Sequence, residues 1–286
     1  MNPPAERGSA RRSDLLAAAF LLLLSLFFFR DVLFGENALV TSNMSRWLPW
    51  RASASIEDLR RPGFRDDAAE TYYPRRFLSW SELREGRIPL WNPYILCGTP
   101  HLADFQSAVF HPANLLLYPF DLLRATGAFV VLHLFLGALF MHLLLRSFGI
   151  GTAASLIGAL SFYFNSYFVT YLGHPPHIAT GCWLPLLFLL VKRSMDGRGG
   201  LWLPPAIALA ALGGFPQTLL YGILAALGYA VWLWVRGRRE GRAGGLARLA
   251  LFAGLLVLGI GIVLFQVLPT AELGLLSGRR EISLES

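Results

Sequence analysis

The chain has 286 residues, of which 55% are hydrophobic and only 15% are charged. Soluble globular domains carry about 25% charged residues, so this composition excludes an ordinary soluble fold and predicts an integral membrane protein. The net charge of +7 is typical of cytoplasmic-loop lysines and arginines that set topology. Membrane-length apolar runs separate these charges, so we do not expect nucleic-acid binding.

The first apolar segment covers residues 15–29 and follows a polar stretch, residues 1–14. Such a pattern is compatible with a signal peptide, but no small-x-small cleavage site follows the apolar run. The segment ends instead in Phe27-Phe28-Phe29-Arg30. We therefore expect a retained first transmembrane helix, with residues 1–14 as a cytoplasmic N-terminus.

Residues 30–125 contain no membrane-length apolar run, and we expect them to form a long extracytoplasmic loop. A structureless connection of this length is uncommon, so part of it should be helical. Aromatic and aliphatic side chains recur in it at helical spacing, at Tyr73, Phe77, Trp80 and Leu83. With arginines between them, they predict a helix at the membrane interface that stops near Gly86.

A short apolar stretch, Asn114 to Leu123, precedes the next long apolar run. It is too short to span a bilayer, and Pro119 interrupts it. We expect it to lie at the surface or to lead into the next helix.

We expect residues 126–268 to form a multi-helix transmembrane region. Its apolar segments are at about 126–148, 150–172, 178–195, 201–213, 215–236 and 246–268. Together with the first segment they predict an all-α polytopic membrane protein with about seven transmembrane helices. If every segment crosses, the basic residues after the second, fourth and sixth fall in the cytoplasm, as the positive-inside rule requires. These residues are Arg146, Lys192, Arg193, Arg198, Arg236, Arg238, Arg239 and Arg242.

The stretch 201–236 allows either one helix or two. A single helix would leave one flanking basic cluster outside, whereas a hairpin broken at Gly213-Gly214-Phe215-Pro216 keeps both inside. We therefore expect a hairpin whose first arm is short for a hydrocarbon core of about 30 Å. Residues 269–286 would then form an extracytoplasmic tail, and we expect the chain to be the N-terminal portion of a longer protein.

Two adjacent carboxylates, Asp66 and Asp67, lie in the long loop just before the expected interfacial helix. They are either solvated surface charges or part of a candidate active site. A carboxylate there could accept a proton from a sugar hydroxyl as a general base, or it could help to hold a divalent cation. The nearby Arg75 and Arg76 suit a phosphate group, because guanidinium presents a planar fork of donors.

His174 and His177 flank two prolines in the expected outer turn between the third and fourth spans. They could bind a lipid phosphate, relay protons or ligate a metal, or they could simply be polar turn residues. Asn92 and Gln106 belong to a polar group in the long loop that either lines a substrate cleft or forms surface. The cofactor requirement stays unknown, with a divalent cation as one option.

The loop resembles the YfhO-like bacterial membrane proteins, which are related to the GT-C superfamily of polytopic glycosyltransferases. The resemblance rests mainly on three blocks: Asp67 with Tyr72-Tyr73-Pro74; Leu83-Arg84-Glu85-Gly86-Arg87-Ile88-Pro89-Leu90-Trp91-Asn92-Pro93-Tyr94; and His111-Pro112-Ala113-Asn114-Leu115. Gly98-Thr99-Pro100, Ala103, Gln106, His174 and Trp183-Leu184-Pro185-Leu186 also fit, so the pattern covers most of residues 65–190.

The resemblance implies a multi-pass enzyme of the bacterial inner (cytoplasmic) membrane that uses a polyprenyl-phosphate-linked sugar at the outer face. The acceptor would be an envelope polymer, lipid or protein. Asp67 matches the first-loop acidic position that activates the acceptor or coordinates a metal, and Asp66 beside it is the second candidate. From the chemistry of the residue types, we expect substrate contacts from Tyr73, Arg75, Arg76, Asn92, Gln106, His174 and His177.

A different hypothesis is a non-catalytic transporter, flippase or assembly factor for envelope polymers. It predicts that polar residues inside the spans, such as His133, His142 and Gln217, matter more than the outer loop.

Overall fold

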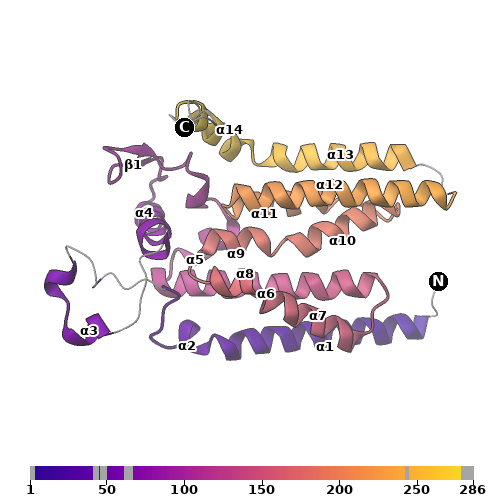
Figure 1. Ribbon diagram of the computed structural model, residues 1–286, viewed down its shortest axis with the longest axis horizontal. Helices are drawn as coiled ribbons and strands as arrows, with labels where there is room; N and C mark the ends of the chain where they lie inside the picture. Colours follow the sequence, from indigo (N-terminus) through magenta and orange to yellow (C-terminus); the bar gives the residue numbers. More distant parts are fainter. Residues whose placement is uncertain (1–3, 41–44, 46–49, 61–66, 242–244, 278–286) are drawn as a thin grey trace.

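The computed structural model describes residues 4–40, 45, 50–60, 67–241 and 245–277. Figure 1 shows long helices lying side by side, with shorter elements gathered at one end of the bundle. We call that end the cap end, because it carries residues 68–118 and the last helix. Nearly all regular structure in the described residues is helical, which confirms the all-α fold class.

The bundle consists of helices that run between the cap end and the opposite end. In chain order they are α1 (Pro4–Phe28), α6 (Leu122–Ser147), α7 (Thr152–Tyr163), α8 (Ser166–Thr170), α9 (Pro175–Gly181), α10 (Leu184–Met195), α11 (Leu203–Leu212), α12 (Pro216–Arg239) and α13 (Gly245–Ile262).

Short elements make up the rest of the described chain. They are α2 (Arg30–Leu33), η2 (Trp50–Ser53), α3 (Ile56–Arg60), η3 (Ala68–Tyr72), α4 (Tyr73–Arg84), β1 (Trp91–Asn92), β2 (Thr99–Pro100), η4 (Phe105–Ser107), α5 (Pro112–Leu117) and α14 (Leu264–Leu275). The strands β1 and β2 pair antiparallel, with Trp91 opposite Pro100.

Four helical segments in the described residues are long and apolar enough to cross a membrane. They are Leu122–Ser147, Pro175–Met195, Pro216–Arg239 and Gly245–Ile262. This is the composition of a membrane protein. The other three expected spans do not meet the same criterion, because α11 has ten residues, α1 begins with charged residues and the 150–172 segment is broken.

The expectation of one continuous helix over 150–172 is wrong. The helix stops at Tyr163 and resumes at Ser166, because the side chain of Asn165 replaces backbone hydrogen bonds. Its Oδ1 accepts from the Phe168 amide at 2.9 Å, and its Nδ2 donates to the Phe162 carbonyl at 2.7 Å. A second break, at Cys182 and Trp183, separates α9 from α10, where Pro185 has no amide hydrogen to donate.

The expected hairpin over 201–236 is confirmed as two helices, α11 and α12. The turn between them needs glycine at two positions. A side chain on Gly213 would lie 2.7 Å from the Thr180 hydroxyl, and Gly214 has a φ of +95°. Pro216 then starts α12 at a position where its missing amide hydrogen costs nothing.

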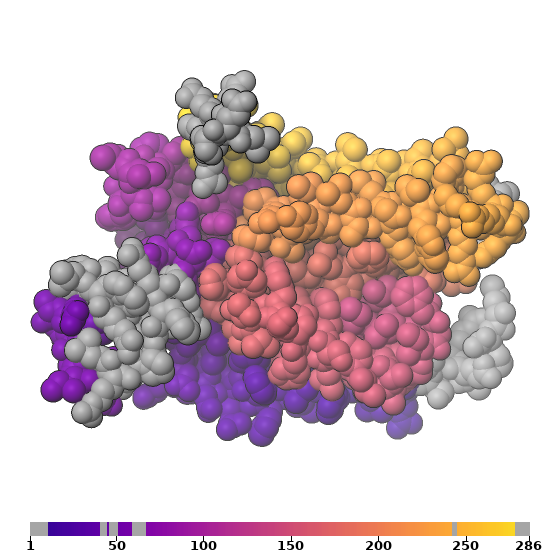
Figure 2. All heavy atoms as spheres, viewed as in Figure 1, coloured from indigo at the N-terminus to yellow at the C-terminus, as the bar shows by residue number. Residues whose placement is uncertain are grey.

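The last expected span, 246–268, is divided differently from the prediction. Helix α13 ends at Ile262, and α14 begins at Leu264 and continues past residue 268 to Leu275. Two hydrogen bonds tie α14 to the loop before η4, from Gln266 Nε2 to the Leu102 carbonyl and from Thr270 Oγ1 to the Ala103 carbonyl. Helix α14 therefore fixes the loop before η4 to the end of α13, and Figure 2 shows the magenta loop residues and the visible yellow residues at the same end of the molecule.

Close helix packing depends on small residues, as is usual where lipid removes the hydrophobic drive between helices. A methyl group on Gly259 of α13 would lie 2.8 Å from the Ile207 Cβ of α11, and one on Gly158 of α7 would lie 2.3 Å from Leu145 Cδ1 of α6. Two apolar cores result, one mainly among α9–α13 and one among α1 and α6–α9.

Candidate functional site

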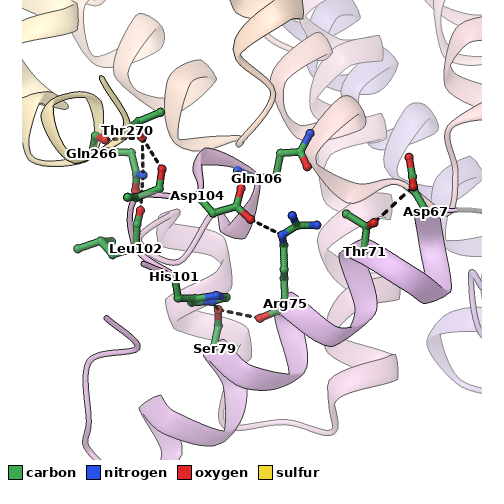
Figure 3. Close-up of polar contacts among 11 residues, drawn as sticks. Asp67, Thr71, Arg75, Ser79, His101, Leu102, Asp104, Gln106, Gln266 and Thr270 are labelled. Atoms are coloured by element: carbon green, nitrogen blue, oxygen red, sulfur yellow. Dashed lines mark hydrogen bonds and ion pairs between the residues drawn. The ribbon is translucent and has the colours of Figure 1, made fainter. Parts of the chain in front are cut away.

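A polar stripe runs along η3 and α4 at the cap end (Figure 3). Its members are four residues apart, which places them on one helix face. They are Asp67, Thr71, Arg75 and Ser79. The Thr71 hydroxyl donates to Asp67 Oδ1 at 3.4 Å, and Ser79 Oγ donates to the Arg75 carbonyl at 3.0 Å. The first turn of this stripe is a π-helix, a rare form that is frequent at functional sites.

Asp67 stands at the start of this stripe with an exposed side chain. Its long hydrogen bond to Thr71 leaves acceptor capacity on the carboxylate. This geometry permits Asp67 to take a proton from a bound hydroxyl. Asp66, the second expected carboxylate, lies outside the described residues.

Arg75 forms an ion pair with Asp104, which comes from the loop before η4. Both side chains are partly exposed, at 21% and 24%. The second oxygen of Asp104 accepts the Gln106 amide hydrogen at 3.1 Å, so Asp104 also caps η4. Arg75 and the Gln106 backbone therefore both contact Asp104, and Figure 3 shows the three residues in one view.

A buried contact between Ser79 and His101 joins the polar stripe to the loop before η4. Ser79 Oγ and His101 Nε2 are 2.9 Å apart, and both side chains are buried. Burial lowers the pKa of His101 to about 4, while the charge of Asp104 opposes this shift. His101 is therefore a neutral structural link at pH 7.

Tyr72 lies between Asp67 and the histidines of the bundle. Its side chain is 3% exposed, and its ring meets His174 at 5.2 Å and His177 at 6.0 Å, edge to face in both cases. Burial raises the pKa of Tyr72 well above its ordinary value, and the negative charge of Asp67 raises it further. Tyr72 therefore stays protonated and can donate a hydrogen bond.

His177 is the centre of what we call the aromatic–histidine cluster, which consists of Tyr72, Tyr171, His174, His177 and Phe215. Its ring stacks on the ring of Tyr171, with ring centres 4.1 Å apart, and its ring centre lies 3.6 Å from that of Phe215. Rings from η3, from the loop before α9 and from the α11–α12 turn thus meet at the cap end. The cluster joins three segments that lie far apart in the sequence.

Arg76 points to the other side of α4 and is buried, in contrast to Arg75. Its Nε donates to Thr126 Oγ1 at 3.0 Å, and its guanidinium lies 4.9 Å from the Phe129 ring centre. Within the described part of the chain it has no carboxylate partner, and Nη2 makes no hydrogen bond. Burial lowers the pKa of Arg76, although it remains a cation at pH 7.

His111 and His133 form a buried pair that links the cap to α6. The Ala113 amide donates to His111 Nδ1 at 3.3 Å, and His133 Nδ1 donates to the Phe129 carbonyl at 2.7 Å. The two Nε2 atoms are 3.3 Å apart, so His111 donates and His133 accepts between them. Burial lowers the pKa of His111 well below its ordinary value. Both rings are occupied by internal hydrogen bonds.

Two of the expected substrate residues lie apart from this group. Tyr73 faces outward and stacks loosely on Phe77, with ring centres 6.5 Å apart. Asn92 is buried in the β1–β2 hairpin, where its Oδ1 accepts the Tyr94 amide hydrogen at 3.0 Å. That contact gives Asn92 a turn-forming role.

Two of the polar residues singled out for a transport function each have one internal partner, although His142 Nδ1 is buried without a hydrogen bond among the described residues. His142 Nε2 is 3.3 Å from Asp14 Oδ1, and Gln217 Nε2 donates to the Tyr221 hydroxyl at 2.9 Å. Among the described residues, no group of three histidine, cysteine or carboxylate side chains is arranged to hold a metal ion.

Sequence reasoning did not identify Tyr171 and Phe215 as part of the site. Tyr171, His174 and His177 are spaced three residues apart, which is a signal that could have grouped them. Phe215 gave no local signal beyond its place between Gly214 and Pro216.

Comparison of the chain with protein-family models, with curated proteins and with solved structures finds no match. The resemblance to YfhO-like proteins therefore stays a prediction.

Proposed function

We propose that the protein is a membrane glycosyltransferase that moves a sugar from a polyprenyl-phosphate donor to an envelope acceptor at the outer face of the bacterial cytoplasmic membrane. The observation that carries this proposal is the exposed Asp67 carboxylate beside the aromatic–histidine cluster, at one end of an apolar helix bundle. A catalytic group in that position can reach a substrate whose lipid part stays in the bilayer.

The proposed topology has seven crossings, with the N-terminus in the cytoplasm and the cap outside. The crossings are α1, α6, α7 with α8, α9 with α10, α11, α12 and α13. Their support is the alternating direction of these elements along the bundle (Figure 1). Arg146, Lys192 and Arg236 lie in the last turns of helices that end opposite the cap, as the positive-inside rule requires of a cytoplasmic side.

In the proposed reaction, Asp67 removes the proton from an acceptor hydroxyl as that oxygen attacks the anomeric carbon of the donor sugar. The bond between the anomeric carbon and the phosphate oxygen breaks, and polyprenyl phosphate leaves with the bonding electron pair. The proton resides on Asp67 until solvent removes it. Arg75, fixed by Asp104, is the cation that faces the leaving phosphate, and Tyr72 supplies a neutral donor.

Arg76 fits a different part in this proposal. Because its side chain is buried between α4 and α6, Arg76 contributes positive electrostatic potential to the site without direct contact with the substrate. Tyr73 and Asn92 are likewise placed outside the reacting centre.

The test is transfer of radiolabelled sugar from polyprenyl-phosphate donors, in membranes from cells that express the chain or its Asp67→Asn variant. Loss of a general base lowers rates by about 100- to 10,000-fold, so we expect Asp67→Asn to remove most transfer at normal insertion. The matched control is Glu70→Gln, which neutralises another exposed carboxylate on the same short helix.

Full activity in Asp67→Asn would contradict the assigned base. Absence of transfer by well-inserted wild-type protein, with every donor tried, would contradict the enzyme and leave the transport or assembly hypothesis.

A further inference from the structure

A large apolar groove lies on the bundle between α7 and α8 on one side and α9, α10 and α12 on the other. The hollow measures about 970 Å³ when the space that is open to the surroundings is included. Its walls include Phe162, Phe168, Phe188 and Tyr221, and its floor includes Gly181 and Gly222, which lack side chains. A methyl group on Gly222 of α12 would lie 2.5 Å from Leu184 Cδ2 of α10, so no side chain fits between the two helices at this position.

Two of the helix interruptions in the described residues border this groove. Asn165 and Ser166 line it at the α7–α8 break, and Gly181 and Leu184 line it at the α9–α10 break. Interrupted helices at membrane depth are tolerated where they surround a cavity, and they mark binding sites in other membrane proteins. The coincidence of two breaks with one hollow indicates a built site.

One end of the groove adjoins the aromatic–histidine cluster. Tyr167 lines the groove, and its ring lies 5.0 Å from Tyr171 and 6.4 Å from His177. Its hydroxyl is 3.0 Å from Thr218 Oγ1, so it also bridges α8 to α12. From Thr218 the groove follows α12 to Ala225, a helical rise of about 10 Å.

We infer that this groove binds the isoprenoid chain of the lipid-linked ligand, with the phosphate end directed toward the aromatic–histidine cluster. The inference rests on the proposed function and specifies its substrate recognition. An apolar hollow that opens from the side of a membrane bundle is accessible to hydrocarbon from the bilayer. Tyr167 lines the groove and contacts the aromatic–histidine cluster. A lipid whose hydrocarbon chain lies in the groove would therefore have its polar head group at the candidate site, and the proposed donor is such a lipid.

The first experiment narrows the groove with Ala225→Trp and compares it with Leu224→Trp. Both positions are exposed, but only Ala225 lines the groove. Each methylene of the donor that the tryptophan excludes from the groove loses the binding free energy of its burial. We therefore expect Ala225→Trp to raise the KM for a long-chain donor about tenfold or more. A short, water-soluble isoprenyl donor should show the same KM in both variants and the wild type.

An equal rise for Leu224→Trp, or an equal rise for the short donor, would overturn the assignment. The first outcome would indicate a general disturbance of the bundle, and the second an effect on the cap.

The second experiment needs no activity. A long-chain polyprenyl phosphate with a diazirine in its first isoprene units is photolysed with the purified protein, and the labelled peptides are identified. We expect labels on α8 and α12 that Ala225→Trp removes and Leu224→Trp retains. Equal labelling by a diazirine phosphatidylglycerol would overturn the proposal in favour of ordinary bilayer lipid. Groove labelling without any sugar transfer would sustain the groove and contradict the proposed enzyme.

Discussion

At the end of the bundle opposite the cap, the Asp14 carboxylate of α1 is enclosed by two groups of α6. Arg146 Nε donates to its Oδ1 at 2.8 Å, and His142 Nε2 lies 3.3 Å from the same oxygen. At the cap end, the Asp67 carboxylate receives a long hydrogen bond from Thr71, four residues along its own helix, and is exposed.

The two carboxylates therefore serve different purposes. Asp14 joins α1 to α6 across 132 residues of sequence, and its oxygen is committed to that contact. Asp67 is held by a local bond that costs little to break, so it stays available to a ligand. Asp14 and Asp104 each connect two elements, whereas the hydrogen bond that Asp67 receives from Thr71 is local.

The most direct test of these different roles is to exchange each aspartate for asparagine. Asp14→Asn removes the charge from a partly buried ion pair and should lower the free energy of unfolding by about 2 kcal/mol. Asp67→Asn should change the free energy of unfolding by less than about 0.5 kcal/mol, while sugar transfer falls by about 100- to 10,000-fold. Thermal unfolding in detergent measures both, and a stable Asp14→Asn protein would contradict the assigned clamp.

Acid should weaken the cap through His101. Its folded pKa of about 4 lies below the ordinary value of 6.5, so the unfolded chain binds the proton more readily. The stability contributed by neutral His101 is present above pH 6.5 and is lost as pH falls toward 4, by about 2 kcal/mol between pH 7 and 5. His101→Gln, which keeps a partner for Ser79, should reduce the pH dependence of the unfolding temperature, and an unchanged slope would contradict this prediction.

Arg76 sharpens the contrast within the cap itself. Arg76 is a buried cation that has no carboxylate partner among the described residues, and such a cation is costly. Arg76→Met should therefore raise the free energy of unfolding by about 1 kcal/mol despite the lost bond to Thr126. Chemical unfolding of wild type and variant measures the change. A loss of stability on substitution would indicate that the guanidinium contacts outweigh its desolvation.

The smallest effect is expected for an exposed ion pair at the end opposite the cap. Arg236 Nε lies 2.8 Å from Glu240 Oε1, with side chains 57% and 38% exposed. Arg236→Ala should leave the free energy of unfolding nearly unchanged, because solvent screens an exposed pair, in contrast to the Asp14 clamp at the same end. A larger loss would show that exposure is a poor guide to which ion pairs hold the helices together.

The sequence determined much of the fold because its signals are local. Long apolar runs predict helices in lipid, and the aromatic repeat from Tyr73 to Leu83 predicts the helix that the structure has as α4, with Gly86 just beyond it at a φ of +74°. The Gly213-Gly214-Phe215-Pro216 turn fixed the hairpin. The break at Asn165 was missed because apolar composition does not reveal where a side chain replaces a backbone bond. The break at Cys182–Trp183 was missed although Pro185 is visible in the sequence.

Only the tertiary structure decided which polar residues meet. Arg75 and Arg76 are adjacent in the sequence, but successive residues point about 100° apart on a helix. One therefore pairs with Asp104 at the surface, and the other is buried against Phe129. Tyr72, His177 and Phe215 converge because packing of η3, α9 and the α11–α12 turn brings them to one end of the bundle. Contacts of such long sequence separation leave no periodic trace, so the site could be proposed from the sequence but its membership could not.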